Sequence, residues 1–423
     1  MKVLWVTLRI FSDEQEKKTG VWLKALAIRL TELHKIEIVN VSTSSNVEKL
    51  TTFDYRSVKQ WVIPEKPYSL FGNSSSDLKS SFNQVILYEK PDIIQIWGSE
   101  NPLGLLPFTL KTDALRLLAI QGVMGSISDR SLLGMNFLDK IACIGLREIL
   151  TGRSIFSIKK SFSKDAKSEA IMLRNCDYIM VQSNWTFSQI CQINPGAKYY
   201  WVHRQLRPEF LSLQKKWHEC QRKEIVIFSA AVGYSLKGLH ILIDALAIVK
   251  EKFPNIKLKL AGETGRKDWL GEGYIRFILR KIKKLNLENN VDWLGPLSAE
   301  ELISNFQASS VFVNPSFVES YSMILAEAMA VGTPSVISFS GAMPELAEND
   351  KEVLFFPPGD YFKLAYNIFS ILSNENKALK LSLASQKRSR ERNFQYDNAL
   401  EQFKIYKEIL KTRADDSQRN QKP

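Results

Sequence analysis

The sequence predicts an α/β protein composed of two doubly wound domains, each with a parallel sheet covered by helices. The chain has 423 residues, which is long for one hydrophobic core and suits two domains of about 200 residues each. Short apolar segments alternate with helical patterns, and this alternation starts afresh near residue 224. Apolar residues make up 45% of the chain and charged residues 24%, a balance typical of a globular protein rather than a disordered one.

Residues 1–207 are predicted to form the N-terminal domain. The first segment, MKVLWVTLRIF, is too short for a secretory signal and is better interpreted as the first strand of a sheet. Gly20 then precedes a helical pattern at 21–33. Further strand-like runs lie at 36–42, 92–98, 116–122 and 178–183. The sequence has no apolar run of about 18 residues or more, so it predicts no membrane-spanning helix.

Residues 208–393 are predicted to form the C-terminal domain, after a polar boundary stretch at 208–223. We expect strands at 224–232, 256–263, 291–295, 309–316 and 333–339. Helical patterns occupy 237–253, 274–285, 362–373 and, after this domain, 398–410. The polar residues from Thr412 onward predict a disordered tail at 413–423.

The most informative segment is NPSFVESYSMILAEAMAVGTP at 314–334, which contains two carboxylates, Glu319 and Glu327. A helix is predicted from Met323 to Gly332, with Ser320 or Ser322 as its N-cap. The free N–H groups at such a helix start form a natural seat for a diphosphate. If most of the step is helical, the carboxylates lie up to ~12 Å apart along the axis, which suits the ribose and the hexose of a nucleotide sugar. The alternative is a surface glutamate in a loop and a solvated glutamate on a helix.

This segment resembles the signature of retaining glycosyltransferases of family 4, which have the GT-B fold. The matching elements are Pro315-Ser316, Glu319, Glu327-Ala328-Met329-Ala330 and Gly332-Thr333-Pro334. The resemblance implies two Rossmann-like domains with an interdomain cleft, and a C-terminal helix at 394–412 that crosses back to the first domain. It also implies transfer of a hexose from a nucleotide sugar with retention at the anomeric carbon.

The resemblance implies roles for the residues of the segment and for Lys237, which opens the helix after the strand at 224–232. Glu319 and Lys237 are the expected catalytic residues: Glu319 positions the hexose, and Lys237 stabilises the leaving diphosphate. Glu327 is expected to hold the ribose, and the donor site is completed by Ser320, Tyr321 and Ser322. Lys237 could instead be an ordinary residue in the first turn of a surface helix, where the helix dipole disfavours a cation.

Two positions depart from the family pattern around the phosphates. The family commonly has an arginine six residues before the lysine, and this chain has Ala231 there, which removes one cation. The family tends to have two adjacent glycines after the first strand, and this chain has Thr19 and Gly20. Gly20 either lets the backbone approach the donor closely or simply forms the turn before a helix.

Two polar side chains follow strands of the first half. Gln121 ends the strand at 116–122, where many relatives place a histidine, and an amide can hydrogen-bond a sugar hydroxyl but cannot act as a base. Together with DIIQIWGSENP, it resembles a bacterial subgroup whose members have that glutamine. Glu100 is then a candidate for sugar or acceptor contact, or else an exposed loop carboxylate.

The net charge of +12 requires an anionic partner or a structural explanation. Residues 131–167 predict an amphipathic helix, with Leu133, Phe137 and Ile141 on one face, followed by a basic run. Such a segment could rest on an anionic membrane, or the helix could pack on its own sheet and the charges be solvated. The basic residues are scattered and no nucleic-acid motif accompanies them, so we expect no nucleic-acid partner.

The sequence therefore predicts a cytoplasmic, metal-independent hexosyltransferase acting on a glycan or a lipid-linked acceptor in surface polysaccharide biosynthesis, in peripheral contact with the inner membrane face at most. No cofactor is expected beyond a donor such as a UDP- or GDP-hexose, because no Asp-x-Asp or His/Cys metal spacing occurs. Two alternatives remain: a non-catalytic nucleotide-sugar-binding scaffold, which Ala231 and Gln121 favour, and a nucleotide-sugar epimerase on similar sheets.

Overall fold

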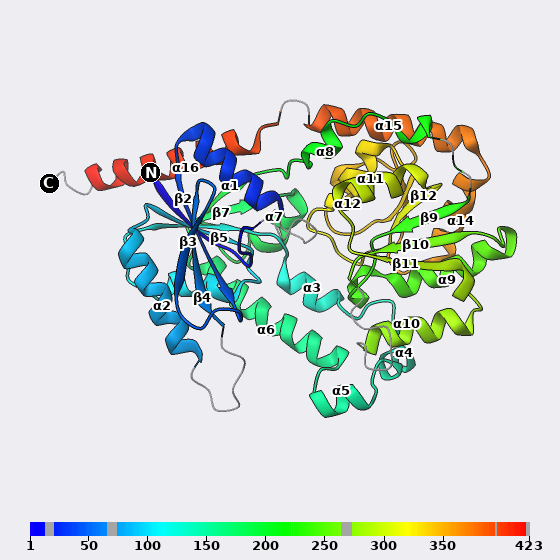
Figure 1. Cartoon of the computed structure of the whole chain (residues 1–423), viewed down its shortest axis with the longest axis horizontal. Helices are drawn as coiled ribbons and strands as arrows, with labels where there is room; N and C mark the ends of the chain where they lie inside the picture. The colour runs from blue at the N-terminus through cyan, green and yellow to red at the C-terminus, as the bar shows by residue number, and fades with distance from the viewer. Residues whose placement is uncertain are drawn as a thin grey trace.

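The computed structural model describes residues 1–12, 21–65, 74–220, 222, 224–263, 273–393 and 396–419. These residues form two α/β domains that lie side by side (Figure 1). Gly20 falls outside the described residues, so its predicted role in donor binding stays a prediction.

The N-terminal domain contains, in the described part of the chain, an eight-stranded sheet with the order β3-β4-β2-β1-β5-β6-β7-β8. The pairings are parallel except for β3 with β4. The strands are β1 (Lys2–Val6), β2 (Glu37–Ser44), β3 (Thr51–Tyr55), β4 (Val58–Pro64), β5 (Ile93–Trp97), β6 (Leu115–Ala119), β7 (Tyr178–Val181) and β8 (Lys198–Trp201). The helical segments are α1 (Val21–His34), α2 (Ser74–Glu89), η2 (Pro102–Phe108), α3 (Met124–Arg130), α4 (Phe137–Ala142), α5 (Leu146–Thr151), α6 (Ile155–Arg174) and α7 (Asn184–Ile190).

The C-terminal domain contains a six-stranded parallel sheet, again within the described residues, with the order β11-β10-β9-β12-β13-β14. Its strands are β9 (Val226–Ser229), β10 (Lys257–Ala261), β11 (Val291–Gly295), β12 (Val311–Asn314), β13 (Ser335–Ser338) and β14 (Leu354–Phe356). Its helical segments are α8 (Pro208–Leu211), η3 (Trp217–Glu219), η4 (Ser235–Lys237), α9 (Leu239–Lys252), α10 (Gly273–Lys284), η5 (Glu288–Asn290), α11 (Ala299–Ala308), α12 (Met323–Val331), α13 (Met343–Leu346), α14 (Tyr361–Leu372) and α15 (Glu375–Asn393).

The central strands are buried on both faces, which explains their continuous apolar sequences. In β1 the residues Val3 to Val6 are fully buried, and in β12 Val311 to Val313 are fully buried. Parallel sheets require this pattern because helices cover both of their faces. The α/β class and the two doubly wound sheets predicted from the sequence are confirmed.

The last helix, α16 (Asn398–Arg419), packs on the N-terminal domain rather than on the C-terminal one that precedes it (Figure 1). Tyr406 is fully buried and accepts a hydrogen bond of 2.9 Å from the indole of Trp5. At the start of the helix, Asp397 forms an ion pair of 2.9 Å with Arg29 of α1. The helix continues to Arg419, so the prediction of a disordered tail was wrong for residues 413–419.

The region 131–167 also differs from the prediction of one amphipathic helix. It is divided into α4, α5 and the first part of α6, in the bottom part of the view in Figure 1. The breaks occur at glycines: Gly134 and Gly152 have positive φ angles, and Gly145 is the extended N-cap of α5. Helical spacing of apolar residues cannot persist across such breaks, since glycine readily leaves the helical conformation.

Candidate active site

The loop after β12 leads directly into α12, as the sequence predicts, and Ser322 is the N-cap. Its hydroxyl accepts a hydrogen bond of 3.4 Å from the backbone N–H of Leu325 and another of 3.0 Å from the side chain of Asn314. The helix ends at Gly332, whose φ of 86° is the left-handed C-cap conformation. The N-terminus of a nine-residue helix thus lies at the carboxyl end of the sheet, where doubly wound folds bind ligands.

Lys237 and Glu319 form an ion pair at this edge. Lys237 Nζ lies 2.7 Å from Glu319 Oε1, which also accepts a hydrogen bond of 2.8 Å from Ser316 Oγ. Their side chains are 35% and 14% exposed, so the pair is open to solvent on one side. The structure therefore brings together the two residues that the sequence predicts as catalytic, from loops that follow two adjacent strands.

Close backbone packing holds these loops together. The N–H of Phe317 donates to the carbonyl of Leu236 over 2.9 Å. Gly238 has φ of 72°, and a Cβ at this position would clash with the carbonyl of Pro315. A third loop, after β13, supports Glu319 from the other side: the N–H of Ala342 donates to the Glu319 carbonyl over 2.8 Å.

Glu327 lies within α12 and has a different environment from Glu319. Its side chain is only 5% exposed, and Oε1 accepts a 2.8 Å hydrogen bond from Nε of Arg207, in the linker between the domains. Burial raises the pKa of the Glu327 carboxyl, and the charge of Arg207 opposes that increase. The two glutamates thus have separate basic partners, and the predicted contact of Glu327 with ribose stays a prediction.

Ser320 and Tyr321 make contacts between the two domains. The carbonyl of Ser320 accepts a hydrogen bond of 3.1 Å from the hydroxyl of Ser183, at the start of α7. The Tyr321 hydroxyl donates to the carbonyl of Arg204 over 3.3 Å, and burial raises the pKa of that hydroxyl. Both side chains are buried. Ser320 and Tyr321 therefore lie at the junction of the domains, and their role at the donor site stays a prediction.

Arg204 is a candidate site residue that sequence reasoning missed. Its guanidinium lies 4.8 Å from the centre of the Trp22 ring, and its Nε is buried without a hydrogen-bond partner among the described residues. Burial lowers the pKa of Arg204 to about 10, although the charges of Glu100 and Glu319 favour the cation. Nothing in the local sequence HRQLR distinguishes Arg204 from a solvated linker residue. The residues that surround it in space come from both domains and are distant in the sequence.

Glu100 lies in the loop after β5 and is not an exposed loop carboxylate. Its Oε2 atom is buried and unpartnered within the part of the chain that the structure describes. Burial raises the pKa of Glu100 to about 7, with the charge of Arg204 opposing the increase and that of Glu169 adding to it. A carboxyl with this pKa can exchange a proton near neutral pH.

Gln121 follows β6, the neighbour of β5, and is half-buried. Next to it, the carbonyl of Gly122 accepts a hydrogen bond of 3.2 Å from Ser99, whose hydroxyl also donates to Glu169. Gln121 and Glu100 therefore both lie at the carboxyl edge of the N-terminal sheet. Through its charge interactions with Arg204, Glu100 is linked to Glu319 of the other domain.

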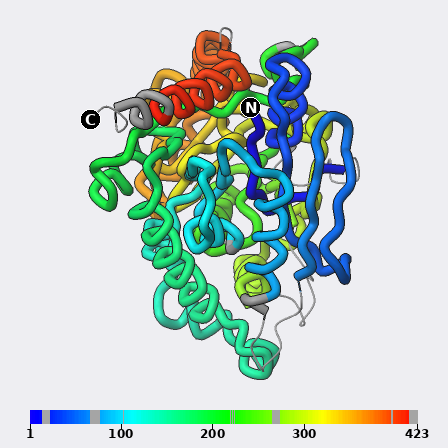
Figure 2. The backbone as a smooth tube through the Cα atoms, turned by 90° about the vertical axis from the view of Figure 1, so that its left-hand side faces the viewer, coloured from blue at the N-terminus to red at the C-terminus, as the bar shows by residue number. Residues whose placement is uncertain are grey.

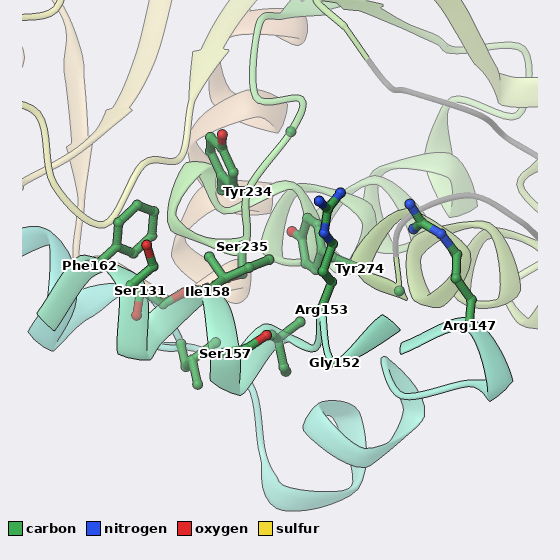
Figure 3. Close-up of a pocket in the computed structure, with 15 residues that line it drawn as sticks. Ser131, Arg147, Gly152, Arg153, Ser157, Ile158, Phe162, Tyr234, Ser235 and Tyr274 are labelled. Atoms are coloured by element: carbon green, nitrogen blue, oxygen red, sulfur yellow. Dashed lines mark hydrogen bonds between the residues drawn. The ribbon is translucent and has the colours of Figure 1, made fainter. Parts of the chain in front are cut away.

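A pocket of about 490 Å³ lies between the domains (Figure 3). One wall comes from the N-terminal half, with Arg153 and Phe162, and the other from the loop after β9, with Tyr234 and Ser235. Ser235 is two residues from Lys237, and its hydroxyl donates to the carbonyl of Ser131 across the junction. None of the residues predicted for the site is among those that line this pocket, so it lies beside the predicted site and not at it.

The described residues contain no group of three or more His, Cys, Asp or Glu side chains arranged to hold a metal ion. Among the helices in the described ranges, none combines the length and the apolar character needed to cross a membrane. The four cysteines are all free.

Part of the chain is similar in sequence to known proteins. Residues 212–388 match the family model of glycosyl transferases group 1. The chain is 24% identical over 237 residues to mannosylfructose-phosphate synthase of Agrobacterium fabrum, an alignment that covers 54% of this chain and 52% of that protein. It is 37% identical over 139 residues to D-inositol 3-phosphate glycosyltransferase of Pseudarthrobacter chlorophenolicus, covering 32% of this chain and 31% of that protein. The chain thus spans about half, or less, of the length of these curated relatives.

Solved structures resemble the whole chain. Sucrose-phosphate synthase of Thermosynechococcus elongatus superposes with a TM-score of 0.71 at 15% identity, over 97% of this chain and 99% of that chain. Anabaena Alr3699/HepE in complex with UDP and glucose superposes with a TM-score of 0.65 at 16% identity, over 97% and 99%. These likenesses identify the fold as GT-B.

Proposed function

We propose, from the premise that a GT-B fold here contains a group 1 glycosyl transferase domain, that the chain is a retaining hexosyltransferase of family 4. It transfers a hexose from a nucleotide sugar to a hydroxyl of a glycan or a lipid-linked acceptor in surface polysaccharide biosynthesis. The observation that carries the proposal is the ion pair of Lys237 and Glu319 beside the N-terminus of α12. The UDP complex of the structurally similar Anabaena protein supports a nucleotide-sugar donor.

In this proposal the donor diphosphate lies between Lys237 and the start of α12. An anion there would meet the Lys237 ammonium and the unpaired N–H groups of the first helical turn. In the structure, Glu319 neutralises Lys237 over 2.7 Å. When the diphosphate engages the ammonium, the Glu319 carboxylate becomes available to accept hydrogen bonds from hexose hydroxyls. Charge that develops on the leaving phosphate is then stabilised by groups already in position.

Glu327 is placed in the same proposal as the residue that holds the ribose. Its Oε1 is engaged by Arg207, and a carboxylate has a second oxygen that can accept ribose hydroxyls. The ion pair also holds the side chain in one orientation, which lowers the entropy cost of binding.

Retention follows in this scheme from attack on the same face that the diphosphate leaves. The departing phosphate oxygen takes the proton of the acceptor hydroxyl, so no protein nucleophile and no metal is required. We place the reaction in the cytoplasm, in peripheral contact with the inner face of the membrane. Gln121 and Glu100, at the edge of the N-terminal sheet, are the proposed contacts to sugar or acceptor.

The test is a panel of UDP-, GDP- and ADP-sugars added to the purified protein, with thermal unfolding as the first measurement. A donor at about 100 times its Kd stabilises the folded state by about 2.7 kcal/mol, which is readily measured. The stabilising donor is then incubated with the protein, and the products are followed by NMR for release of nucleotide and for the anomeric configuration. Absence of stabilisation by every nucleotide sugar would contradict the proposal.

The two other functions give different results in the same experiment. A binding scaffold, favoured by Ala231 in place of the family's arginine, would be stabilised by the donor but would release no nucleotide. An epimerase would interconvert the free donor with no acceptor present. Slow hydrolysis of the donor would exclude both alternatives if the released sugar has the same anomeric configuration as it has in the donor.

A further inference from the structure

The segment that joins α3 to α6 exposes an unusual number of large apolar side chains. We call residues 137–151, which comprise α4 and α5, the α4–α5 projection; it lies at the lower edge of the molecule in Figures 1 and 2. Six of its side chains are between 46% and 76% exposed: Phe137, Leu138, Ile141, Leu146, Ile149 and Leu150. Apolar groups gathered in this way on a monomer mark a surface that binds something.

The exposure does not result from a loosely attached segment, because the other face of the projection is anchored. Glu148 is buried and forms an ion pair with Arg276 of α10. Arg280, one turn further along α10, donates to the carbonyl of Ala142. Cys143 is fully buried between these two contacts. The apolar side chains are therefore displayed outward from a backbone held against the C-terminal domain.

Cations surround the apolar side chains. Residues 137–160 contain five basic and two acidic residues, and one of the acidic residues is Glu148, which pairs with Arg276 and lies 3.7 Å from Arg147. The basic residues are Lys140, Arg147, Arg153, Lys159 and Lys160. Lys159 and Lys160 are exposed on the first turns of α6, directly after the projection. Interfaces between proteins are depleted in lysine, whereas apolar side chains beside lysines and arginines are typical of surfaces that bind anionic lipid.

The projection also borders the interdomain pocket. Arg147, Gly152 and Arg153 line that pocket together with Ser235, which is two residues from Lys237 (Figure 3). A membrane in contact with the projection would therefore border this interdomain pocket, which adjoins the short helix η4 that carries Lys237. A lipid-linked acceptor held in that membrane would approach the protein on this side, whereas a soluble acceptor would need no such surface.

We propose that the α4–α5 projection docks the protein on an anionic membrane, with its apolar side chains inserted among the lipids and its cations on the headgroups. This inference deepens the membrane contact of the proposed function by naming the surface that makes it. Its test needs neither donor nor acceptor, so its failure and the failure of the proposed function are distinguishable.

The experiment is co-sedimentation of the full chain with two kinds of vesicle, of phosphatidylcholine alone and of phosphatidylcholine mixed with phosphatidylglycerol. We expect binding to the mixed vesicles that weakens as salt is added, because salt screens the attraction between cations and headgroups. The variant Leu146→Ser/Ile149→Ser/Leu150→Ser should lose at least about tenfold in vesicle affinity, since three inserted side chains are removed. The variant Lys159→Gln/Lys160→Gln should lose about tenfold on mixed vesicles and little on phosphatidylcholine.

The matched control replaces apolar side chains of similar exposure elsewhere, Phe362→Ser/Tyr366→Ser on α14, which are 66% and 61% exposed. This control should bind vesicles like the wild type. Thermal unfolding of the triple serine variant, followed by circular dichroism, should give a Tm close to that of the wild type, which shows that it is folded. The proposal is overturned if the wild type does not bind mixed vesicles or if the triple variant binds as well as the control. It is also overturned if the wild type self-associates through the projection, since a second copy would then cover it.

Discussion

Replacement of Lys237 by alanine should separate catalysis from stability. The Lys237–Glu319 pair is 2.7 Å long, and its side chains are 35% and 14% exposed, so water screens it. A pair of this kind contributes about 1 kcal/mol or less to folding, which corresponds to a Tm change of about 2–4 °C in a domain of this size. Glu319 would also keep its hydrogen bond from Ser316. The variant should therefore be folded.

The effect on turnover should be much larger. In the proposed mechanism the Lys237 ammonium meets charge that grows on the leaving diphosphate, and removal of one such group lowers kcat by about 10²–10³-fold, or roughly 3–4 kcal/mol. The assay measures kcat and KM for the donor, with donor affinity determined separately by calorimetry. Lys237→Arg, which keeps the charge, should recover part of kcat. Lys351→Ala removes a lysine from an exposed ion pair on the surface and serves as the control.

Two results would refute this reasoning. Equal losses in kcat/KM and in donor affinity, with kcat unchanged, would make Lys237 a residue for ground-state binding only. A fall in Tm well beyond about 4 °C would mean that the pair is a structural element whose loss distorts the loop after β12.

Three further changes test other parts of the site. Glu327→Ala should weaken nucleotide binding tenfold or more in calorimetry, since charged hydrogen bonds contribute roughly 1.5–3 kcal/mol. Arg207→Ala should lower the stability of the fold and have a smaller effect on nucleotide affinity. Unchanged affinity in Glu327→Ala would exclude the ribose role. Gly341→Ala should impair turnover and lower Tm, because Gly341 has φ of 57° and a Cβ there would clash with the backbone of Glu319; normal kinetics would show that this loop can adjust without moving the carboxylate. The raised pKa of Glu100, about 7 in the folded protein against an ordinary 4.5, means that the folded state holds the proton more tightly, so stability falls as pH rises from 4.5 to 7. In Glu100→Gln, the free energy of unfolding should fall by roughly 2–3 kcal/mol less than in the wild type between pH 4.5 and 7, as measured by denaturant unfolding. Identical pH profiles for variant and wild type would contradict the environment assigned to Glu100.

Local sequence reasoning was sufficient where the determinants lie within a few residues of one another. Strand β12, helix α12 and its end at Gly332 were predicted from an apolar run, a capping serine and a glycine, and all are present. The choice between Ser320 and Ser322 as the N-cap needed the structure. Asn314 lies beside Ser322, whereas the carbonyl of Ser320 faces Ser183 of the other domain.

The same reasoning failed where local periodicity and glycine conflict. The apolar spacing of Leu133, Phe137 and Ile141 predicted one amphipathic helix in the region 131–167, but glycines divide that region into α4, α5 and the first part of α6. Because the region is divided into separate helices, its apolar residues no longer lie on one common face that could pack against the sheet. Leu138 and Leu150 are instead 74% and 76% exposed, which the helical interpretation could not anticipate.

The sequence by itself determined the class of fold, the order of its main strands and helices, and the two loops that carry Lys237 and Glu319, because each depends on periodicity, capping and breaking residues close together in the chain. Only the tertiary structure decided which charges meet. Glu319 pairs with a lysine 82 residues away, Glu327 with an arginine of the domain linker 120 residues away, and Glu100 interacts with Arg204. The physical reason is that the environment of a charged group depends on whatever the fold places within a few ångströms, and sequence separation carries no information about that distance.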